Sequence, residues 1–321
     1  MNKRIRGIAT LALALLCIPA WAETFPTKPV RLIVASGPGG STDTLARTLG
    51  DRVIPVWNQA FVYDNRPGAG GQIAGELTAR AVPDGYTLLF STSAAIAVSV
   101  SLYKKLPYDP VKDFSPIVLA ATQPYMLIAN PSSATSVREL IAMAKAKPGD
   151  IGFAHTGVGT GTHLAGELFM HVTGVKLLSV PYKSIGASLV AVVSGETPLT
   201  FTSIHSAWSQ AKAGRARALA VTGKTRSPAA PQVPTMAEAG VPNYVIGNWY
   251  GVLGPAGTPP AIVAQVNRQI NTVLARQDVR DTLTNQGFDA AGGTPQEFAR
   301  FIKSEIAAYA ALIKSAGINA N

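Results

Sequence analysis

Apolar residues along the chain fall into short continuous runs and into helical spacings. The run "VRLIVAS", residues 30–36, predicts a buried strand, and the segment after Ser41 places Leu45, Leu49 and Val53 on one helical face. The stretches "FVYDN" and "YTLLFST" predict two further strands with a short helix between them. Strands that alternate with helices need crossover connections and favour a largely parallel sheet. The pattern therefore predicts an α/β fold.

A second series with the same order begins after "KPGD". An offset of 119 residues (164 − 45) aligns its "LA" with the "LA" of the first helix, and it pairs Gly159 with Gly40, Thr160 with Ser41 and Tyr182 with Tyr63. A different offset, 111 (201 − 90), places "LTFTS" on "LLFST". The recurrence predicts two similar α/β domains, each with a glycine loop at the carboxyl end of its first strand. Ligands of open α/β sheets bind at such strand ends.

Two amphipathic helices are predicted in the last third of the chain, in "TPPAIVAQVNRQINTVL" and "TPQEFARFIKSEIAAYAALIKSAG". In the second, Thr294 can cap the helix, Pro295 suits its first turn and Glu297 completes a capping box. We expect both helices to serve packing.

The first residues have the layout of a secretory signal peptide. Lys3, Arg4 and Arg6 precede the apolar run "IATLALALLCIPA" and the cleavage motif "AWA", so we expect export and cleavage after Ala22. The single cysteine, Cys17, lies in this leader, and Leu16 before it disfavours a lipid anchor. A mature chain without thiols excludes disulfides, cysteine-bound metals and thiol catalysis. Export without disulfides suits the bacterial periplasm.

Charge and composition narrow the class further. The chain has 28 Lys and Arg against 18 Asp and Glu, a formal charge of +10, and loss of the three leader cations leaves +7. These cations are scattered, so no nucleic-acid groove is expected, and a bias towards anionic ligands or simple solubility explains them. With 47% hydrophobic and 14% charged residues, the chain can bury a large core, and its length suggests two domains.

The glycine loops do not match nucleotide motifs. The first lacks the Lys of a phosphate-binding P-loop, and "GVGTGT" has its third glycine too early for a dinucleotide fingerprint. Glycines still allow a ligand to approach the backbone, and N–H groups at a helix start attract anions. Alternatively, the glycines only form tight turns while Ser41 and Asp43 cap a helix. Two matched loops favour a binding site.

Metal and catalytic chemistry find little support. His163, Glu167 and His171 share one helical stripe, but each turn separates such ligands by about 6 Å, so the two histidines cannot close on one ion. His155 and His205 are interpreted as strand-end or surface residues. The sequence has no G-x-S-x-G elbow and no evident triad. We therefore expect no metal, no cofactor and no catalytic residue.

Together these stretches resemble the Bug-type extracytoplasmic solute receptors of tripartite tricarboxylate transport systems. The resemblance covers nearly the whole mature chain, through "PVRLIVASGPGGSTDTLAR", "VYDNRPGAGGQIAGE", "PDGYTLLF", "LPYDPVKDFSPI", "GTGTHLAGE", "VPYKS", "AGRARALAVTG" and "PTMAEAGVPNY". It implies a bilobed periplasmic binding protein fold, with residues 23–123 and 230–321 in the first lobe and 124–229 in the second. It also implies a small carboxylate or amide ligand held between the lobes.

The resemblance also implies which residues bind the ligand. In the first lobe they are Ser36, Gly37, Gly39, Gly40, Ser41 and Asp43, with Ser91 and Ser93 after the strand that ends at Phe90. In the second lobe they are Thr156, Gly157, Val158, Gly159, Thr160 and His163, with Tyr182 and Ser203. The chain departs from the family pattern at Ser36, where an aromatic residue is common, and at Ser203, where an Asp is common. Both departures leave more room or more hydroxyl character.

The leading interpretation is a monomeric, non-catalytic receptor that closes over a small carboxylate and delivers it to a membrane permease or reports it to a sensor. Two other classes stay open. One is an exported enzyme acting on an anionic metabolite with His163 as base, and the other is an interaction protein that binds no small molecule.

Overall fold

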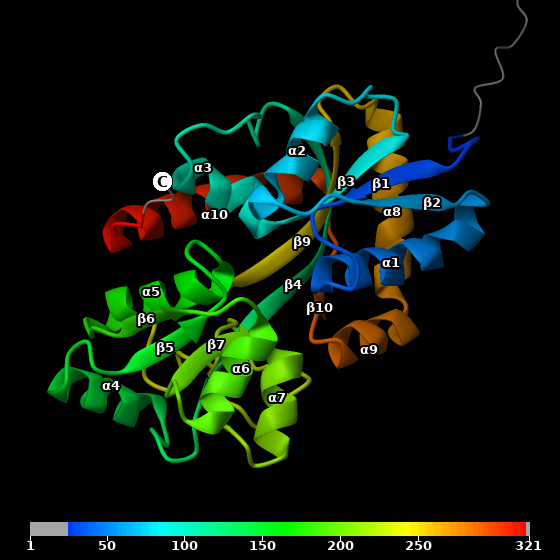
Figure 1. The fold of residues 1–321 in the computed structure, drawn as a ribbon. Coiled ribbons are helices and arrows are strands. Elements are labelled where there is room, and N and C mark those ends of the chain that lie inside the picture. The colour runs from blue at the N-terminus through cyan, green and yellow to red at the C-terminus, as the bar shows by residue number, and fades with distance from the viewer. Residues whose placement is uncertain (1–24, 319–321) are drawn as a thin grey trace, which may run out of the picture.

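The computed structural model describes residues 25–318, so the predicted leader, Cys17 and the cleavage site after Ala22 lie outside the described residues. Figure 1 shows two α/β halves, which the long strands β4 and β9 connect. The strands are β1 (Val30–Val34), β2 (Phe61–Asn65), β3 (Thr87–Thr92), β4 (Phe114–Ala129), β5 (Gly152–His155), β6 (Leu178–Pro181), β7 (Leu199–Ser203), β8 (Arg217–Val221), β9 (Gly247–Pro255) and β10 (Asp289–Ala290).

The helices follow the strands in chain order. The α-helices are α1 (Ser41–Trp57), α2 (Gln72–Ala79), α3 (Ser99–Leu102), α4 (Val137–Ala146), α5 (Gly161–Thr173), α6 (Ile185–Ser194), α7 (Ile204–Lys212), α8 (Pro260–Ala275), α9 (Gln277–Asn285) and α10 (Pro295–Ala316). Two short segments, η1 (Ala69–Gly71) and η2 (Ala94–Val98), are a 3-10 and a π turn.

The sheet is parallel at its two ends and antiparallel in its middle. Its strand order is β2-β1-β3-β9-β4-β7-β5-β6, with β8 and β10 also paired to β4. The β1, β2, β3 set and the β5, β6, β7 set are parallel, as expected for crossover units. Strands β4 and β9 run antiparallel to their neighbours. The largely parallel pairing that the sequence predicted is therefore found only within each half.

Strand β4 belongs to both halves. It pairs with β9 from Phe114 to Pro124 and with β7 from Tyr125 to Ala129. The chain returns to the first half through β9, whose Gly247 lies opposite Pro124. Between β8 and β9, the segment 222–246 packs on the second half, since Val233 shares a buried cluster with Met126. Both crossings between the halves therefore lie side by side, within β4 and at the start of the adjacent strand β9.

Local patterns predicted several elements at their observed positions. The stretch "FVYDN" is β2, and Leu45, Leu49 and Val53 form the buried face of α1. In α10, Thr294 and Glu297 form the predicted capping box. The capping box and the apolar face of this helix could both be predicted, because each depends only on residues close in sequence.

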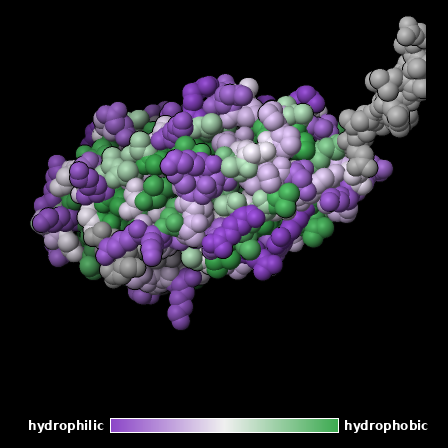
Figure 2. Space-filling model, turned by 90° about the horizontal axis from the view of Figure 1, so that it is seen from above, coloured by the Kyte–Doolittle hydropathy of each residue, from purple (hydrophilic) through white to green (hydrophobic). Residues whose placement is uncertain are grey.

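The buried core continues from one half to the other. One cluster joins Leu102 and Trp249 of the first half to Phe153 and Leu164 of the second, while two smaller clusters lie within the halves. On the surface, Figure 2 shows polar side chains interspersed with smaller apolar areas over the face in view. Within residues 25–318, no helix is both long and apolar enough to cross a membrane.

Candidate functional site

The two glycine loops occupy equivalent places in the two halves. The first connects β1 to α1 and the second connects β5 to α5. In each, the residue before the helix bonds back to a glycine carbonyl three positions earlier: Gly40 N–H to Gly37 O at 3.4 Å and Thr160 N–H to Gly157 O at 3.3 Å. Gly39 and Gly159 share a φ of +77°, which favours glycine.

This equivalence corrects the sequence alignment by one residue. The observed offset is 120 (159 − 39), so Gly159 corresponds to Gly39 and Thr160 to Gly40. The expected offset of 119 rested on the "LA" pairs of the two helices. Hydrogen bonds and backbone angles define the loop instead, and glycine identity alone could not choose between adjacent glycines.

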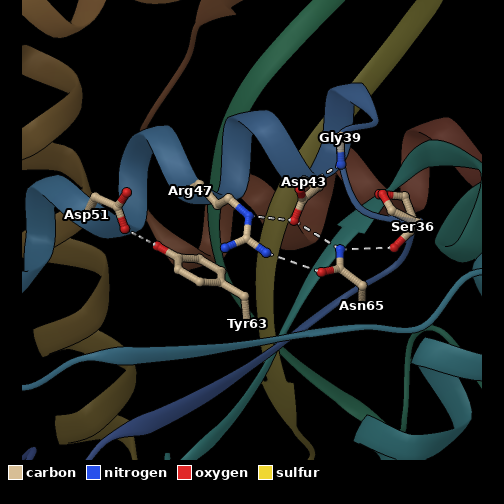
Figure 3. A network of polar contacts seen from close by, with 8 residues as sticks. Ser36, Gly39, Asp43, Arg47, Asp51, Tyr63 and Asn65 are labelled. Carbon is tan, nitrogen blue, oxygen red and sulfur yellow. Dashed lines mark hydrogen bonds and ion pairs between the residues drawn. The ribbon is translucent and has the colours of Figure 1, made fainter.

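Asp43 holds the first loop from within (Figure 3). Its carboxylate accepts the Gly39 N–H at 2.9 Å, the Arg47 guanidinium at 3.0 Å and the Asn65 amide at 2.9 Å. Asn65 also donates to the carbonyl of Ser36 at 3.1 Å. Burial opposes the charged form of Asp43, but bonds from Arg47, Gly39 and Asn65 outweigh it and hold the pKa of this carboxyl below its usual value.

Asp43, predicted as a ligand contact, bonds to protein donors in this structure. Its side chain is 5% exposed and both carboxylate oxygens face protein donors. It positions the loop on which Ser36 and Gly37 lie and which leads into α1 at Ser41. Arg47 and Asn65 complete this arrangement and were not anticipated, because Asn65 enters from β2, 22 residues away in sequence.

Two histidines hold the second loop. The Gly159 N–H donates to His163 Nδ1 at 3.2 Å, and the Gly157 N–H donates to His155 Nδ1 at 3.0 Å. His163 Nε2 lies 3.3 Å from a Glu167 carboxylate oxygen. The hydroxyl of Thr160 donates to the Gly157 carbonyl at 2.7 Å. His163, expected to face the ligand, is 4% exposed and lies beneath the loop.

Both helices that follow the loops begin without a side-chain cap. Gly40 has no side chain that could cap α1, and the Thr160 side chain makes no capping bond to α5 within the part of the chain described. The first intrahelical bonds are made by Thr44 to Gly40 O and by Leu164 to Thr160 O. The N–H groups before them lie at the positive end of each helix dipole. Two helix N-termini of this kind suit an anionic ligand.

Hydroxyl groups at the strand ends fall into two sets. In the first half, Ser91 is fully buried, and its hydroxyl has no hydrogen-bond partner among residues 25–318. Ser93 donates to Asn248 Oδ1 at 2.6 Å, an interaction across from β9 that the sequence did not indicate. The same oxygen also accepts the backbone N–H groups of Ser93 at 3.3 Å and of Trp249 at 3.0 Å, while the amide nitrogen of Asn248 can only donate.

In the second half, two expected ligand contacts bond to the protein itself. Ser203 caps α7, accepting from Ser206 N–H at 3.4 Å and donating to the Ser206 hydroxyl at 2.9 Å. The Tyr182 hydroxyl lies 2.9 Å from Glu196 and 2.6 Å from Thr197. The structure therefore places these two side chains in local networks. Val158 at the loop tip is 60% exposed, and Thr156 bonds to Thr162 within the loop.

The halves touch at the second loop and at α7. A Cβ on Gly159 would lie 2.3 Å from Leu102 of α3, so the second loop packs directly on the first half. On α7, His205 Nδ1 lies 3.0 Å from the carbonyl of Asn285 at the end of α9. A Cβ on Gly287 would lie 3.2 Å from the His205 backbone nitrogen. His205, interpreted from sequence as a strand-end or surface residue, is exposed just after β7, and it also forms a contact between the halves.

Within residues 25–318, no three His, Asp or Glu side chains are grouped to hold a metal ion. The imidazoles of His155 and His163 lie close, with ring centroids 4.6 Å apart, but both Nδ1 atoms are occupied by backbone donors. The site therefore offers backbone N–H groups and hydroxyls.

Residues 45–318 match the family model described as the tripartite tricarboxylate transporter family receptor. The chain belongs to this receptor family. Among curated relatives, it is similar to Protein BugT of Bordetella pertussis, with 37% identity over 96% of this chain and 95% of that protein. The resemblance stated from the sequence motifs is confirmed.

Solved receptors of the same family share the fold. The chain is similar to R. palustris Rpa4515 with adipate, with a TM-score of 0.82, 36% identity and coverage of 92% of this chain and 100% of that one. It is also similar to MatC of Rhodopseudomonas palustris with bound malate, with a TM-score of 0.77, 30% identity and coverage of 90% and 100%. The bilobed α/β binding-protein fold predicted from the sequence is confirmed.

Proposed function

We propose that this receptor binds a small carboxylate between its two halves and passes it to a membrane transporter of the tripartite tricarboxylate type. The observation that carries the proposal is the pair of equivalent glycine loops, each opening a helix whose N-cap residue makes no side-chain capping bond within the described chain. Two helix N-termini provide backbone donors and positive dipole ends for one carboxylate. Adipate and malate in the related receptors support this ligand class.

The ligand would reach the site in the periplasm, after export and cleavage at Ala22. Closure would follow a hinge at the two crossings, Pro124–Tyr125 and the entry to β9 at Gly247. The resemblance predicts a second lobe over residues 124–229. We propose that this lobe extends to residue 246, since Val233 shares a buried cluster with Met126.

The test measures binding at one backbone donor. Ser41 is exposed and is the first residue of α1, where proline is tolerated, and the extended Gly40 (φ −72°, ψ 165°) accepts a following proline. Ser41→Pro deletes the N–H and the hydroxyl, whereas Ser41→Ala deletes the hydroxyl alone. Calorimetric titration with adipate and with malate should give about a tenfold loss for Ser41→Pro and a much smaller loss for Ser41→Ala.

Neutral analogues and product analysis separate the alternatives. Adipamide should bind far more weakly than adipate if a carboxylate is recognised. An enzyme would convert the ligand, so NMR of the recovered ligand should show it unchanged. Mass spectrometry of molecules that co-purify with the receptor identifies the natural ligand. Equal affinities of the two Ser41 variants would refute recognition by the α1 N-terminus.

A further inference from the structure

The second loop is held by imidazole nitrogens at the places where its backbone needs acceptors. Gly157 N–H points at His155 Nδ1 and Gly159 N–H points at His163 Nδ1, at 3.0 and 3.2 Å. A backbone amide can only donate, so each Nδ1 must be unprotonated. In a neutral imidazole the single proton then resides on Nε2.

The second nitrogen of each ring has a partner that suits this tautomer. His155 Nε2 lies 2.7 Å from the Ser179 hydroxyl of β6, and His163 Nε2 lies 3.3 Å from the Glu167 carboxylate of α5. Each ring thus accepts from the loop through Nδ1 and turns its Nε2 away from the loop, towards the Ser179 hydroxyl or the Glu167 carboxylate. The loop conformation and the tautomers support one another.

Protonation would break this arrangement in two ways. A cationic ring carries a proton on Nδ1, which would then face the glycine N–H donor instead of accepting from it. In addition, the two rings are buried, with exposures of 0% and 4%, and their centroids are 4.6 Å apart, so a charge on one opposes a charge on the other.

The surroundings offer one charged partner. Glu167 of α5 faces His163. Among the described residues, it is the carboxylate that contacts this pair of rings. The other neighbours are the Phe153 ring of β5, the Ser179 hydroxyl of β6 and, beside Gly161, the Tyr125 hydroxyl of β4. Burial and the His163 ring lower the pKa of His155 to about 4, which agrees with a neutral ring.

We infer that His155 and His163, as a pair of neutral Nε2–H tautomers, are positioning residues that hold the second loop in its binding conformation, and that protonation of His155 releases the loop. Asp43, the equivalent acceptor in the first loop, is an ion-paired carboxylate and keeps accepting under the same conditions. Acidification therefore affects the second loop and leaves the first loop unchanged. The consequence for ligand affinity rests on the proposed function, while the consequence for the loop does not.

The loop is tested without a ligand, by NMR of the isotopically labelled receptor. At about pH 7.5, the 15N shifts of both rings should show an unprotonated Nδ1 and a protonated Nε2. On titration towards about pH 5 or below, the amide signals of Gly157 and Gly159 should follow the ring signals, while Gly39 should not move with them. A protonated Nδ1 on either ring near neutral pH, or Gly157 and Gly159 signals that ignore ring titration, would overturn the inference.

Conservative variants supply the binding readout. Asn can place its Oδ1 near the Nδ1 position and does not titrate, so His163→Asn should keep adipate binding within a fewfold of wild type, whereas His163→Leu should lose about tenfold or more. In wild type, acidification should weaken adipate binding. With both histidines changed to Asn, this acid-dependent loss of affinity should largely disappear. Equal losses for Asn and Leu, or an unchanged pH profile in the double variant, would contradict the positioning role. Absence of adipate and malate binding at every pH would reject the proposed ligands and leave the NMR result to decide the loop.

Discussion

Asp43 and His163 occupy equivalent positions in the two halves. Each accepts a hydrogen bond from a loop glycine, but through a different chemical group. Each lies in the first turn of its helix, and each accepts a bond from the glycine N–H four residues earlier, at 2.9 and 3.2 Å. One is a carboxylate that pairs with Arg47, and the other is an imidazole whose far nitrogen faces Glu167. Both therefore position a loop from beneath.

Replacement of Asp43 by Asn should destabilise the fold. An amide cannot accept all three of the bonds that Gly39, Arg47 and Asn65 donate, so one partly buried donor loses its partner. We expect a loss of about 2 kcal/mol in the free energy of unfolding, measured by urea denaturation. Asp51→Asn, at an exposed carboxylate that accepts from Tyr63, is the matched control and should change stability by less than about 1 kcal/mol. Equal effects of the two variants would contradict this role.

Acid should weaken the fold through His155. Its pKa is lowered to about 4 by burial and by His163, against 6.5 for an ordinary histidine, so the unfolded chain binds a proton more readily. Stability from this group is present above about pH 6.5 and is lost as the pH falls towards 4. The contribution lost between about pH 7.5 and pH 5 is about 2 kcal/mol.

The measurement compares wild type with His155→Gln by denaturant unfolding at both pH values. The variant should lose less stability on acidification, although it starts from a lower value. His171→Gln, at an exposed histidine of α5, should keep the wild-type pH dependence. A pH dependence that is the same in His155→Gln and wild type would show that another group is responsible.

Gly39 and Gly159 separate backbone strain from packing. Both have a φ of +77°, so alanine is strained at either, at a cost of about 1 kcal/mol. At Gly39 no atom of the described chain lies within 4 Å of the added Cβ, whereas at Gly159 Leu102 lies at 2.3 Å. Gly159→Ala should therefore lose more stability than Gly39→Ala, by thermal unfolding. Leu102→Ala should reduce the difference, and its failure to do so would contradict the packing explanation.

His205 should stabilise the observed arrangement of the halves. Its Nδ1–H donates to the Asn285 carbonyl across the interface at 3.0 Å. Loss of one such bond contributes about 1 kcal/mol, so His205→Ala should lower carboxylate affinity severalfold and enlarge the radius of gyration in small-angle scattering. His205→Asn keeps a donor at that position and should retain more of the affinity. Unchanged scattering and affinity in His205→Ala would show that His205 does not stabilise the arrangement of the halves.

Local sequence determined the building blocks of this receptor. Alternation of apolar runs and helical spacings predicted β1, α1, β2, β3 and their second copy, because strand and helix periodicity are properties of neighbouring residues. Glycines after β1 and β5 and hydroxyl residues beside them marked the loops. The motifs also predicted the receptor family, since they recur in order along most of the chain.

Tertiary structure decided how these pieces form a site. The 16-residue β4 pairs with β9 along one part and with β7 along another, and neither its length nor its partners follow from local periodicity. Asn65 reaches Asp43, and Asn248 reaches Ser93 across 155 residues, so these contacts depend on which strands become neighbours. The loop alignment needed backbone angles to distinguish adjacent glycines. Sequence thus determined what each segment becomes, while packing of distant segments decided which side chains position the loops and which remain for a ligand.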